Sequence, residues 1–330
     1  MARNVYTDLV PDHWFSEYKK ETTTPERRKE IVDNIFKIIR SVNQFPIPTL
    51  DLNETISALR TLTTFDPWGI YKHGNRIELS SIGVMLCSQF YPNIYDVKKK
   101  GTSLSMRDTF YDDKKLRRCI EKILLYGSDI NHLMGWIRIS GCGYCNNFRP
   151  TAAKVVYDTN LKSGSKVYDY AAGYGGRLLG AWAAETVDEY VAVDPNTETY
   201  NNAIKFHTFL NNNFPNLKSF KIFKMGSEDF GIKSNPEYKN YFDMAFSSPQ
   251  YFNTEIYSDE PTQSCHKFNN YERWVKGFFR PTIHNCIDVL KPDGIFAINI
   301  FVKLPNMKKL IQYICNEKDF KLYKVDKLVL

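Results

Sequence analysis

Hydrophobic positions in the first 145 residues recur at helical spacing. Between Pro25 and Ile39 the apolar residues Ile31, Ile35 and Ile39 lie four apart, on one face of a helix. Thr24 precedes Pro25, and a threonine before proline is a typical helix start. Two further helices are expected over residues 51–62 and 114–125, joined by Pro-, Gly- and Asn-rich connections. This part of the chain is therefore predicted to be mainly helical.

After Arg149 the pattern changes to short β-branched and aromatic runs separated by helix-length segments. The expected strands cover residues 166–170, 190–193, 219–224, 242–246 and 294–300. Strands that alternate with helices predict an α/β fold, in which a parallel sheet carries helices on both faces. We expect a helical accessory domain over residues 1–145 and an α/β domain over residues 146–330. Ligands of such sheets bind beyond the carboxyl ends of the strands.

The first three of these strands end in candidate binding residues. The first runs into the glycine-rich turn Asp169 to Arg177 (DYAAGYGGR), where backbone N–H groups can approach a ligand closely. The second ends in Asp194, which can accept hydrogen bonds from both ribose hydroxyls of an adenosine. The third is followed by residues 226–230 (GSEDF), whose polar side chains suit an adenine amino group. A dehydrogenase would need G-x-G-x-x-G, and this turn has Leu178 at the third glycine position.

These strand ends resemble those of the class I, Rossmann-like S-adenosylmethionine-dependent methyltransferases. The resemblance implies a Rossmann-like methyltransferase sheet with S-adenosyl-L-methionine as the cofactor. Residues 147–153 (NFRPTAA) are similar to the segment that encloses the methionine end of the cofactor in amino-methyltransferases. The implied cofactor-binding residues are Phe148, Arg149, Pro150, Asp169, Ala171, Gly173, Gly175, Asp194, Ser227, Glu228 and Asp229.

The fourth strand leads into Ser248-Pro249-Gln250-Tyr251, which resembles the Ser-Pro-Pro-Tyr motif of DNA amino-methyltransferases. An exocyclic amine is a poor nucleophile, because its lone pair is delocalised into the base. The motif implies that the Ser248 side chain and the Pro249 carbonyl accept the two amine hydrogens. Tyr251 would stack on a flipped base and align the amine with the methyl group.

Gln250 departs from the motif, because it replaces a proline that would fix φ. The turn could be looser as a result, or the glutamine could add a polar contact to the base. The stretch that follows is similar to the cytosine-N4 branch of the family. Its matching residues are Tyr257, Gln263, Tyr271, Trp274 and the run 290–294 (LKPDG). The resemblance covers residues 145–303 and favours cytosine N4 over adenine N6.

The distribution of charged residues favours DNA as the expected partner. The net charge is only +7, but eight basic and three acidic residues lie between Lys98 and Arg118. A basic segment of this kind suits a phosphate backbone, although a solvated helix face would show the same pattern. The candidate nucleic-acid-binding residues are Lys98, Lys99, Lys100, Lys114, Lys115, Arg117 and Arg118.

The remaining patterns narrow the class of protein. No apolar run approaches the length that spans a bilayer, and seven irregularly spaced cysteines suit a reducing compartment. A cytoplasmic protein without membrane contact is expected. Cys142 and Cys145 have metal-ligand spacing, but their only second pair would be Cys265 and His266, so no metal is expected. Two alternatives stay open: a protein that binds the cofactor and nucleic acid without catalysis, and an RNA base methyltransferase.

Overall fold

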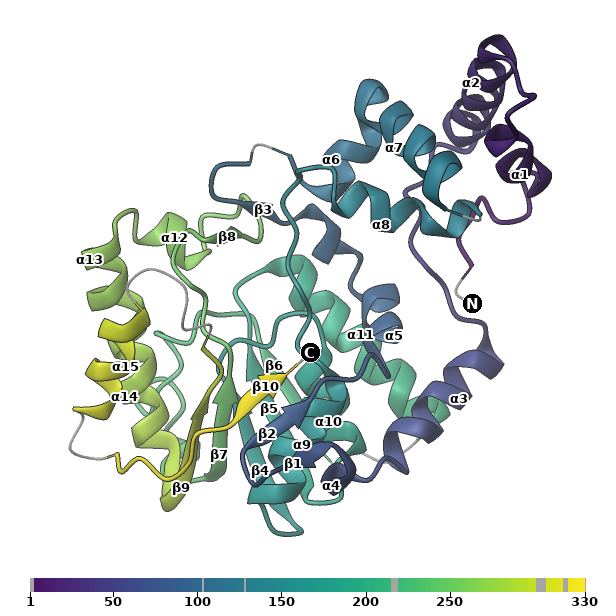
Figure 1. The fold of residues 1–330 in the computed structure, drawn as a ribbon. Helices are drawn as coiled ribbons and strands as arrows, with labels where there is room; N and C mark the ends of the chain where they lie inside the picture. The colour runs from purple at the N-terminus through teal and green to yellow at the C-terminus, as the bar shows by residue number, and fades with distance from the viewer. Residues whose placement is uncertain are drawn as a thin grey trace. The chain divides into compact units, whose positions relative to one another are not determined.

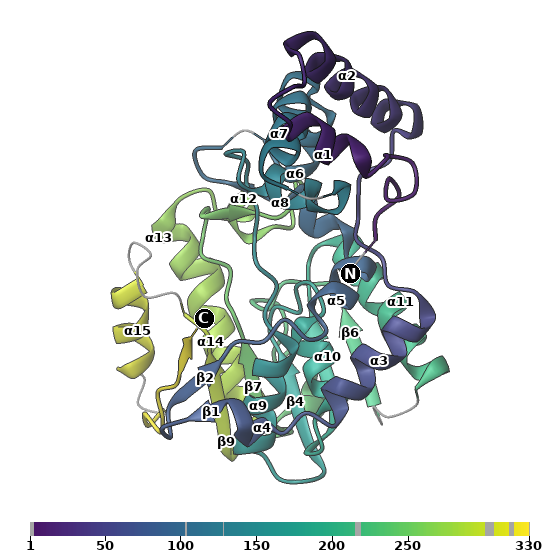
Figure 2. The ribbon, with the colours of Figure 1, turned by 45° about the vertical axis from the view of Figure 1, so that its right-hand side comes forward.

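The computed structural model describes residues 3–102, 104–127, 129–214, 219–300, 307–316 and 320–329, and they form two compact units (Figures 1 and 2). The helical unit comprises Met1–Thr55, Pro92–Asn146 and Asn253–Ser258. The sheet unit comprises Ile56–Tyr91, Asn147–Phe252 and Asp259–Leu330. The expected boundary near residue 146 coincides with one segment end. Residues 56–91, however, lie in the sheet unit, and residues 253–258 lie in the helical unit, which two continuous domains would not produce.

The helical unit confirms the helices expected from apolar spacing. Its elements are α1 (His13–Lys19), α2 (Pro25–Val42), the start of α3 (Leu52–Thr63), η1 (Pro92–Asp96), β3 (Lys98–Lys99), α6 (Met106–Tyr111), α7 (Asp113–Tyr126), η2 (Ile130–His132), α8 (Leu133–Arg138) and β8 (Glu255–Ile256). Thr24 caps α2, because its side chain accepts a hydrogen bond from the backbone N–H of Arg27 at 3.2 Å. The short strands β3 and β8 pair antiparallel.

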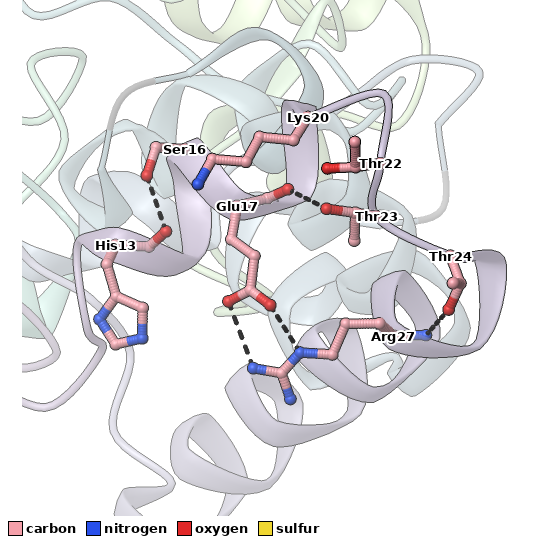
Figure 3. A pocket seen from close by; sticks show the side chains of 8 residues that line it. All are labelled: His13, Ser16, Glu17, Lys20, Thr22, Thr23, Thr24 and Arg27. Carbon is pink, nitrogen blue, oxygen red and sulfur yellow. Dashed lines mark hydrogen bonds and ion pairs between the residues drawn. The ribbon is translucent and has the colours of Figure 1, made fainter.

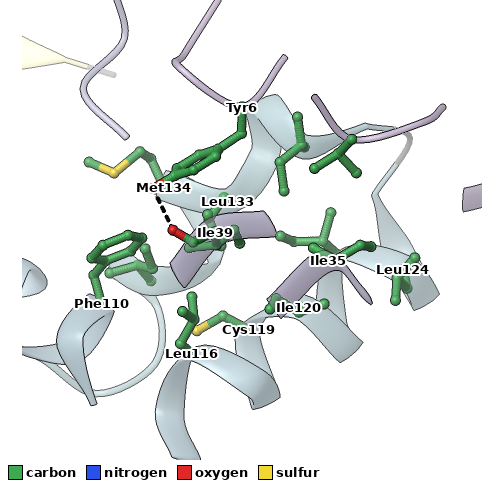
Figure 4. Close-up of a cluster of buried hydrophobic side chains, with 14 of the residues drawn as sticks. Tyr6, Ile35, Ile39, Phe110, Leu116, Cys119, Ile120, Leu124, Leu133 and Met134 are labelled. Atoms are coloured by element: carbon green, nitrogen blue, oxygen red, sulfur yellow. Dashed lines mark hydrogen bonds between the residues drawn. The ribbon is translucent and has the colours of Figure 1, made fainter. Parts of the chain in front are cut away.

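Apolar packing between α2 and α7 holds the helical unit together. Ile35 and Ile39 of α2 are buried in one cluster with Leu116 and Ile120 of α7 (Figure 4). Tyr6 joins this cluster, and its hydroxyl donates to the carbonyl of Gln44. Burial of each such side chain contributes roughly 1.5–3 kcal/mol, so this core accounts for the unit's compactness.

The sheet unit contains the expected parallel sheet. Its central elements are α9 (Pro150–Asn160), β4 (Ser165–Asp169), α10 (Gly176–Ala183), β5 (Val187–Val193), α11 (Thr197–Asn213), β6 (Ser219–Phe223), η3 (Pro236–Tyr238), β7 (Phe242–Ser247), α12 (Ser264–Lys267), α13 (Tyr271–Trp274), the π-helix η4 (Val275–Phe279), α14 (Arg280–Val289), β9 (Leu290–Ile298) and α15 (Met307–Cys315). The strands β4 and β7 are almost wholly buried, as strands of a parallel sheet covered on both faces must be.

The strand order of this sheet is β6-β5-β4-β7-β9, with every neighbouring pair parallel. The order reverses direction at β4, so right-handed crossovers place α10 and α11 on one face and α14 on the other (Figure 1). This is the Rossmann-like arrangement, confirming the expected α/β fold with helices on both faces. The carboxyl ends of β4 and β7 mark its topological switch point.

Two features of the sheets differ most from the sequence expectation. The strand β9 begins at Leu290 and not at Gly294, and an irregularity in its pairing with β7 accommodates Pro292. A second sheet of order β1-β2-β10 was not expected. It joins β1 (Tyr71–Lys72) and β2 (Arg76–Glu78) to β10 (Lys327–Val329), beside α4 (Pro67–Ile70). The helix α5 (Val84–Phe90) packs against α10 and α11. Residues 301–303, at the end of the resemblance, lie outside the described residues.

Candidate functional site at the carboxyl edge of the sheet

The glycine turn after β4 is built by close backbone packing. Gly173 and Gly175 have φ of 59° and 78°, in the left-handed region that favours glycine. A Cβ on Gly176 would lie 2.0 Å from the carbonyl oxygen of Phe148, so only glycine fits there. The turn is tied to the same segment by Asn147, which donates to the carbonyl of Tyr174 at 2.7 Å. The structure therefore brings Asn147 and Phe148 against the glycine turn.

Phe148, Arg149 and Pro150 have different positions in that segment. The Phe148 ring lies edge-on to Phe246, with centroids 5.4 Å apart. Arg149 is the half-buried N-cap of α9, and the buried Pro150 is the first residue of the helix. Backbone packing against Gly176 thus comes from Phe148.

Asp169, at the end of β4, is fully buried and bonded to four groups of the protein. Its carboxylate accepts from Arg177 Nε at 2.8 Å, the Ser247 hydroxyl at 2.7 Å, the Ala171 N–H at 3.1 Å and the Tyr190 hydroxyl. The Arg177 guanidinium also donates to the Ala171 carbonyl. This network fixes the shape of the glycine turn and joins the end of β4 to the end of β7.

Asp194, after β5, has a different environment. It is 9% exposed, and its carboxylate accepts from the backbone N–H groups of Gly173 and Asn196, each at 3.0 Å. Burial raises the pKa of its carboxyl group to about 7, although the two backbone hydrogen bonds lower it. Shifted carboxyl groups cluster at functional sites, so Asp194 is a candidate ligand-binding residue.

The three candidates after β6 point in different directions. The Ser227 hydroxyl is buried against the Thr282 hydroxyl of α14, at 2.8 Å. The Asp229 side chain is 57% exposed and pairs with Lys267 at 2.8 Å. The Glu228 side chain is 4% exposed, and only its Oε1 atom pairs with Lys267, at 2.8 Å. Glu228 Oε2 is buried without a hydrogen-bond partner among the described residues, and burial raises the pKa of this carboxyl group.

The Ser-Pro-Gln-Tyr turn after β7 contacts Asn299, which follows β9, and Arg177 of α10. Asn299, directly after β9, donates from its side chain to Ser248 Oγ at 2.9 Å. Its backbone carbonyl accepts from the Tyr251 hydroxyl at 2.8 Å. Arg177 Nη1 lies 3.5 Å from Ser248 Oγ. The glycine turn and the Ser-Pro-Gln-Tyr turn therefore share one side chain, Arg177, at the switch point of the sheet.

Gln250 anchors the turn in place of a proline ring. The Trp274 indole N–H donates to Ser264 Oγ at 2.8 Å, and the Ser264 hydroxyl donates to Gln250 Oε1. Since the indole can only donate, this chain of bonds has one direction. Burial raises the pKa of the neighbouring Cys265 thiol, and Gln250 lowers it. The glutamine thus ties the turn to α12 and α13.

Segment 259–267 also contacts the other strand ends. Glu260 accepts from the Thr197 backbone N–H at 3.0 Å and from the Thr197 hydroxyl at 3.1 Å. Lys267 pairs with Glu228 and Asp229, as described above. One short segment therefore touches the residues that follow β5, β6 and β7.

The basic residues of the helical unit separate into paired and exposed side chains. Arg117 pairs with Asp33 and lies over the Phe36 ring at 3.9 Å. Lys99 lies over the Tyr144 ring at 4.0 Å. Lys100, Lys114 and Arg118 are exposed, and Lys98 and Lys115 are half-buried. Only part of the basic segment thus presents its charge to solvent.

A hollow in the helical unit, a metal site and a membrane-spanning helix are further features that could indicate a function. A hollow of about 450 Å³ lies at the turn between α1 and α2, lined by residues including Glu17 and Arg27, whose charges pair (Figure 3). None of the candidate site residues lines it. Among the described residues, no group of three or more His, Cys, Asp or Glu could hold a metal ion. No helix in the described part of the chain has both the length and the apolarity to cross a membrane.

Sequence reasoning missed Arg177, Asn299 and Lys267. Arg177 follows the glycine turn directly, but only the fold shows that it bonds to Asp169 and approaches Ser248. Asn299 and Lys267 lie far along the chain from the residues they hold. Contacts between residues so far apart in the sequence leave no spacing pattern that could predict them.

No protein-family model and no curated protein sequence matches the chain. Among solved structures, an S-adenosylmethionine-dependent methyltransferase from Agrobacterium tumefaciens is 14% identical, with 51% of this chain and 49% of that chain covered and a TM-score of 0.34. A methyltransferase homologue from Pyrococcus horikoshii is 18% identical, with 51% and 48% covered and a TM-score of 0.32. An rRNA methylase from Streptococcus thermophilus is 13% identical, with 52% and 82% covered and a TM-score of 0.32. The chain spans about half the length of the first two.

Proposed function

We propose that the protein transfers a methyl group from S-adenosylmethionine to an exocyclic amino group of a DNA base, with cytosine N4 favoured over adenine N6. The observation that carries this proposal is the meeting of two turns at the switch point. The glycine turn after β4 and the Ser-Pro-Gln-Tyr turn after β7 are joined by the Ser247–Asp169 hydrogen bond and by Arg177. A cofactor turn and a target turn must be adjacent for direct transfer between two bound molecules.

The residues present fit an adenosyl cofactor. Asp194 would accept hydrogen bonds from the ribose hydroxyls, and the unpaired Glu228 Oε2 would accept from the adenine amino group. Gly173 and Gly175 would let the backbone approach the methionine part, beside Phe148, Arg149 and Pro150. Asp169 and Ala171 act on the shape of this turn, since Asp169 is bonded within the protein. When bound, the cofactor supplies an electrophilic methyl group.

The chain's own residues would then position the amine. Tyr251 would stack on the flipped base, and its ring is set by the hydroxyl's bond to the Asn299 carbonyl. The Pro249 carbonyl and Ser248 would contact the edge of the base that carries the amine. The hydrogen bond from Ser264 to Gln250 would hold the turn where the family motif has a second proline.

DNA as the partner rests on the resemblance and on the basic residues of the helical unit. Lys100, Lys114 and Arg118 are exposed, and they are the members of the set best suited to contact phosphates. Lys98, Lys99, Lys115 and Arg117 are half-buried, so their contribution would be smaller.

Transfer from labelled S-adenosylmethionine to duplex DNA, single-stranded DNA and RNA tests the proposal, with mass spectrometry of the digested nucleosides. We expect N4-methylcytosine in DNA from the wild type and a 10- to 100-fold lower rate from Tyr251→Ala, in keeping with the cost of losing one stacked base. Ser234→Ala, a turn residue outside the candidate site, is the matched control.

Modified RNA with unmodified DNA would favour the RNA alternative. Cofactor binding without transfer to any nucleic acid would favour a binding protein that lacks catalysis. Undiminished transfer by the Ser248→Ala, Tyr251→Ala double variant would contradict the assignment of the target turn.

A further inference from the structure

Asn299 makes two hydrogen bonds to the Ser-Pro-Gln-Tyr turn and one to Ser247, the residue before it. Its backbone N–H donates to the Ser247 carbonyl at 2.9 Å, and its carbonyl accepts from the Tyr251 hydroxyl at 2.8 Å. Its side-chain amide donates to Ser248 Oγ at 2.9 Å. Asn299 therefore orients the Ser248 and Tyr251 side chains, which would contact the target. It is a positioning residue.

The hydrogen bonds at Ser248 Oγ fix which role its hydroxyl can take. A hydroxyl has two lone pairs that accept and one hydrogen that it can donate. One lone pair faces the Asn299 amide, and the other faces Arg177 Nη1 at 3.5 Å. A guanidinium has no acceptor, so Arg177 can only be the donor of this contact. Within the described part of the chain, Ser248 Oγ donates to no acceptor.

We propose that Ser248 donates its proton to the target instead of accepting from the amine, so that the target carries an unprotonated ring nitrogen next to its amino group. This inference rests on the proposed function and revises the role that the motif implied for Ser248. Cytosine, with N3 beside N4, and adenine, with N1 beside N6, have this edge. Guanine has a ring N–H beside its amino group on the Watson–Crick edge and would set donor against donor. The amine hydrogens are then left to the Pro249 carbonyl.

The charge beside Ser248 agrees with this direction. Arg177 is buried, and it is paired with Asp169 through Nε while Nη1 faces the hydroxyl. When a donor bonds to the oxygen of a hydroxyl group, it polarises the O–H bond, and the hydroxyl becomes a stronger hydrogen-bond donor. An amine nitrogen gains positive charge as its new bond forms, so its hydrogens are accepted better by a neutral carbonyl than by an oxygen next to a guanidinium.

A double-mutant cycle with base analogues tests the proposal. Wild type and Ser248→Ala are assayed for kcat/KM on oligonucleotides that contain cytosine or 3-deazacytosine, or adenine and 1-deazaadenine if adenine is the methylated base. The deaza bases keep the amine and lose the ring acceptor. We expect Ser248→Ala to lower kcat/KM roughly tenfold on the natural base, the value of one hydrogen bond, and to change it less than twofold on the deaza base. The cycle cancels the different intrinsic reactivity of the two amines.

Asn299→Asp adds a second, independent arm. The new carboxylate accepts the Ser248 proton, so the variant should lose its response to the ring nitrogen while it still binds S-adenosylmethionine in calorimetry. The Ser248→Ala arm stands without this variant if it does not fold.

Equal losses of kcat/KM on both bases in Ser248→Ala would overturn the inference, because an acceptor for the amine would serve both analogues alike. Methyl transfer to no base by the wild type would overturn the proposed function itself, and so differs from that result.

Discussion

The two units of this protein use charged side chains in different ways. In the helical unit the Arg117–Asp33 pair leaves 40% and 33% of the two side chains exposed. In the sheet unit the Arg177–Asp169 pair leaves only 6% and 0% exposed, and each partner makes further hydrogen bonds to backbone groups. Burial of an ion pair is costly unless its remaining polar atoms are satisfied. Its presence at the strand ends indicates a pair retained to shape a turn.

Within the described part of the chain, buried polar atoms without a partner occur in both units, among them Arg40 Nη1 in the helical unit and Glu228 Oε2 in the sheet unit. Glu228 Oε2 is buried without a hydrogen-bond partner among the described residues, and the pKa of Asp194 is raised to about 7 by burial. A buried carboxylate oxygen without a donor, such as Glu228 Oε2, costs stability in the protein alone, and a ligand that supplies the donor would stabilise it. The comparison shows that total charge is a poor guide to a site, and that the environment of each charge is a better one.

The largest expected effect is a difference in stability between variants of the buried and the exposed ion pair. Asp169→Ala leaves Arg177 buried and unpaired, and we expect it to lower the free energy of unfolding by about 3–5 kcal/mol. Asp33→Ala removes the matching partner of Arg117 at a half-exposed position, for about 0–1 kcal/mol. Urea denaturation of both variants measures the difference. Similar losses would mean that the buried pair has no special role.

The second prediction concerns Glu228, whose Oε2 atom has no hydrogen-bond partner among the described residues. Glu228→Gln should weaken S-adenosylmethionine binding by about 10- to 100-fold, because a hydrogen bond to a charged group is worth about 1.5–3 kcal/mol. Asp229→Asn, its exposed neighbour with the same Lys267 partner, should change the Kd less than about threefold. Calorimetry measures the Kd of both variants. A larger increase in Kd for Asp229→Asn than for Glu228→Gln would contradict the assignment of the adenine contact to Glu228.

The third prediction uses the raised pKa of Asp194. The ionised carboxylate is the better acceptor for ribose hydroxyls, so affinity should fall as the pH falls through about 7. We expect binding about tenfold weaker at pH 6 than at pH 8. For the protein without ligand the sign is opposite, because a carboxyl group whose pKa rises on folding favours the folded state increasingly as the pH drops from about 7 to about 4. Calorimetry across this range, with Asp194→Asn as the pH-independent control, tests the assignment.

The smallest effect is expected in the helical unit. Lys114→Ala and Arg118→Ala should each reduce the slope of log K against log salt concentration for duplex DNA by up to about 0.9, as the loss of one phosphate contact would. Lys29→Ala, an exposed lysine of α2 outside the basic segment, is the control and should leave the slope unchanged. Unchanged slopes in all three variants would remove these residues from the DNA-binding proposal.

The local sequence determined the elements and much of their order. The Ile31, Ile35 and Ile39 spacing gave α2, and the glycine-rich turn was placed correctly between β4 and α10. These successes share one reason: helix periodicity, capping and glycine conformation depend on residues within a few positions of one another. The register of β9 and the pairing of β10 with β2 depend on partners distant in sequence, and the sequence did not reveal them.

The same division holds within the candidate site. The sequence marked Asp194 and Ser248 by their positions after strands. Only the tertiary structure placed Arg177 and Asn299 around Ser248. Because both donate to Ser248 Oγ, the hydroxyl hydrogen is left to bond to a target. Residue type lists the donors and acceptors a side chain has, but the direction of each hydrogen bond depends on neighbours that the fold brings together.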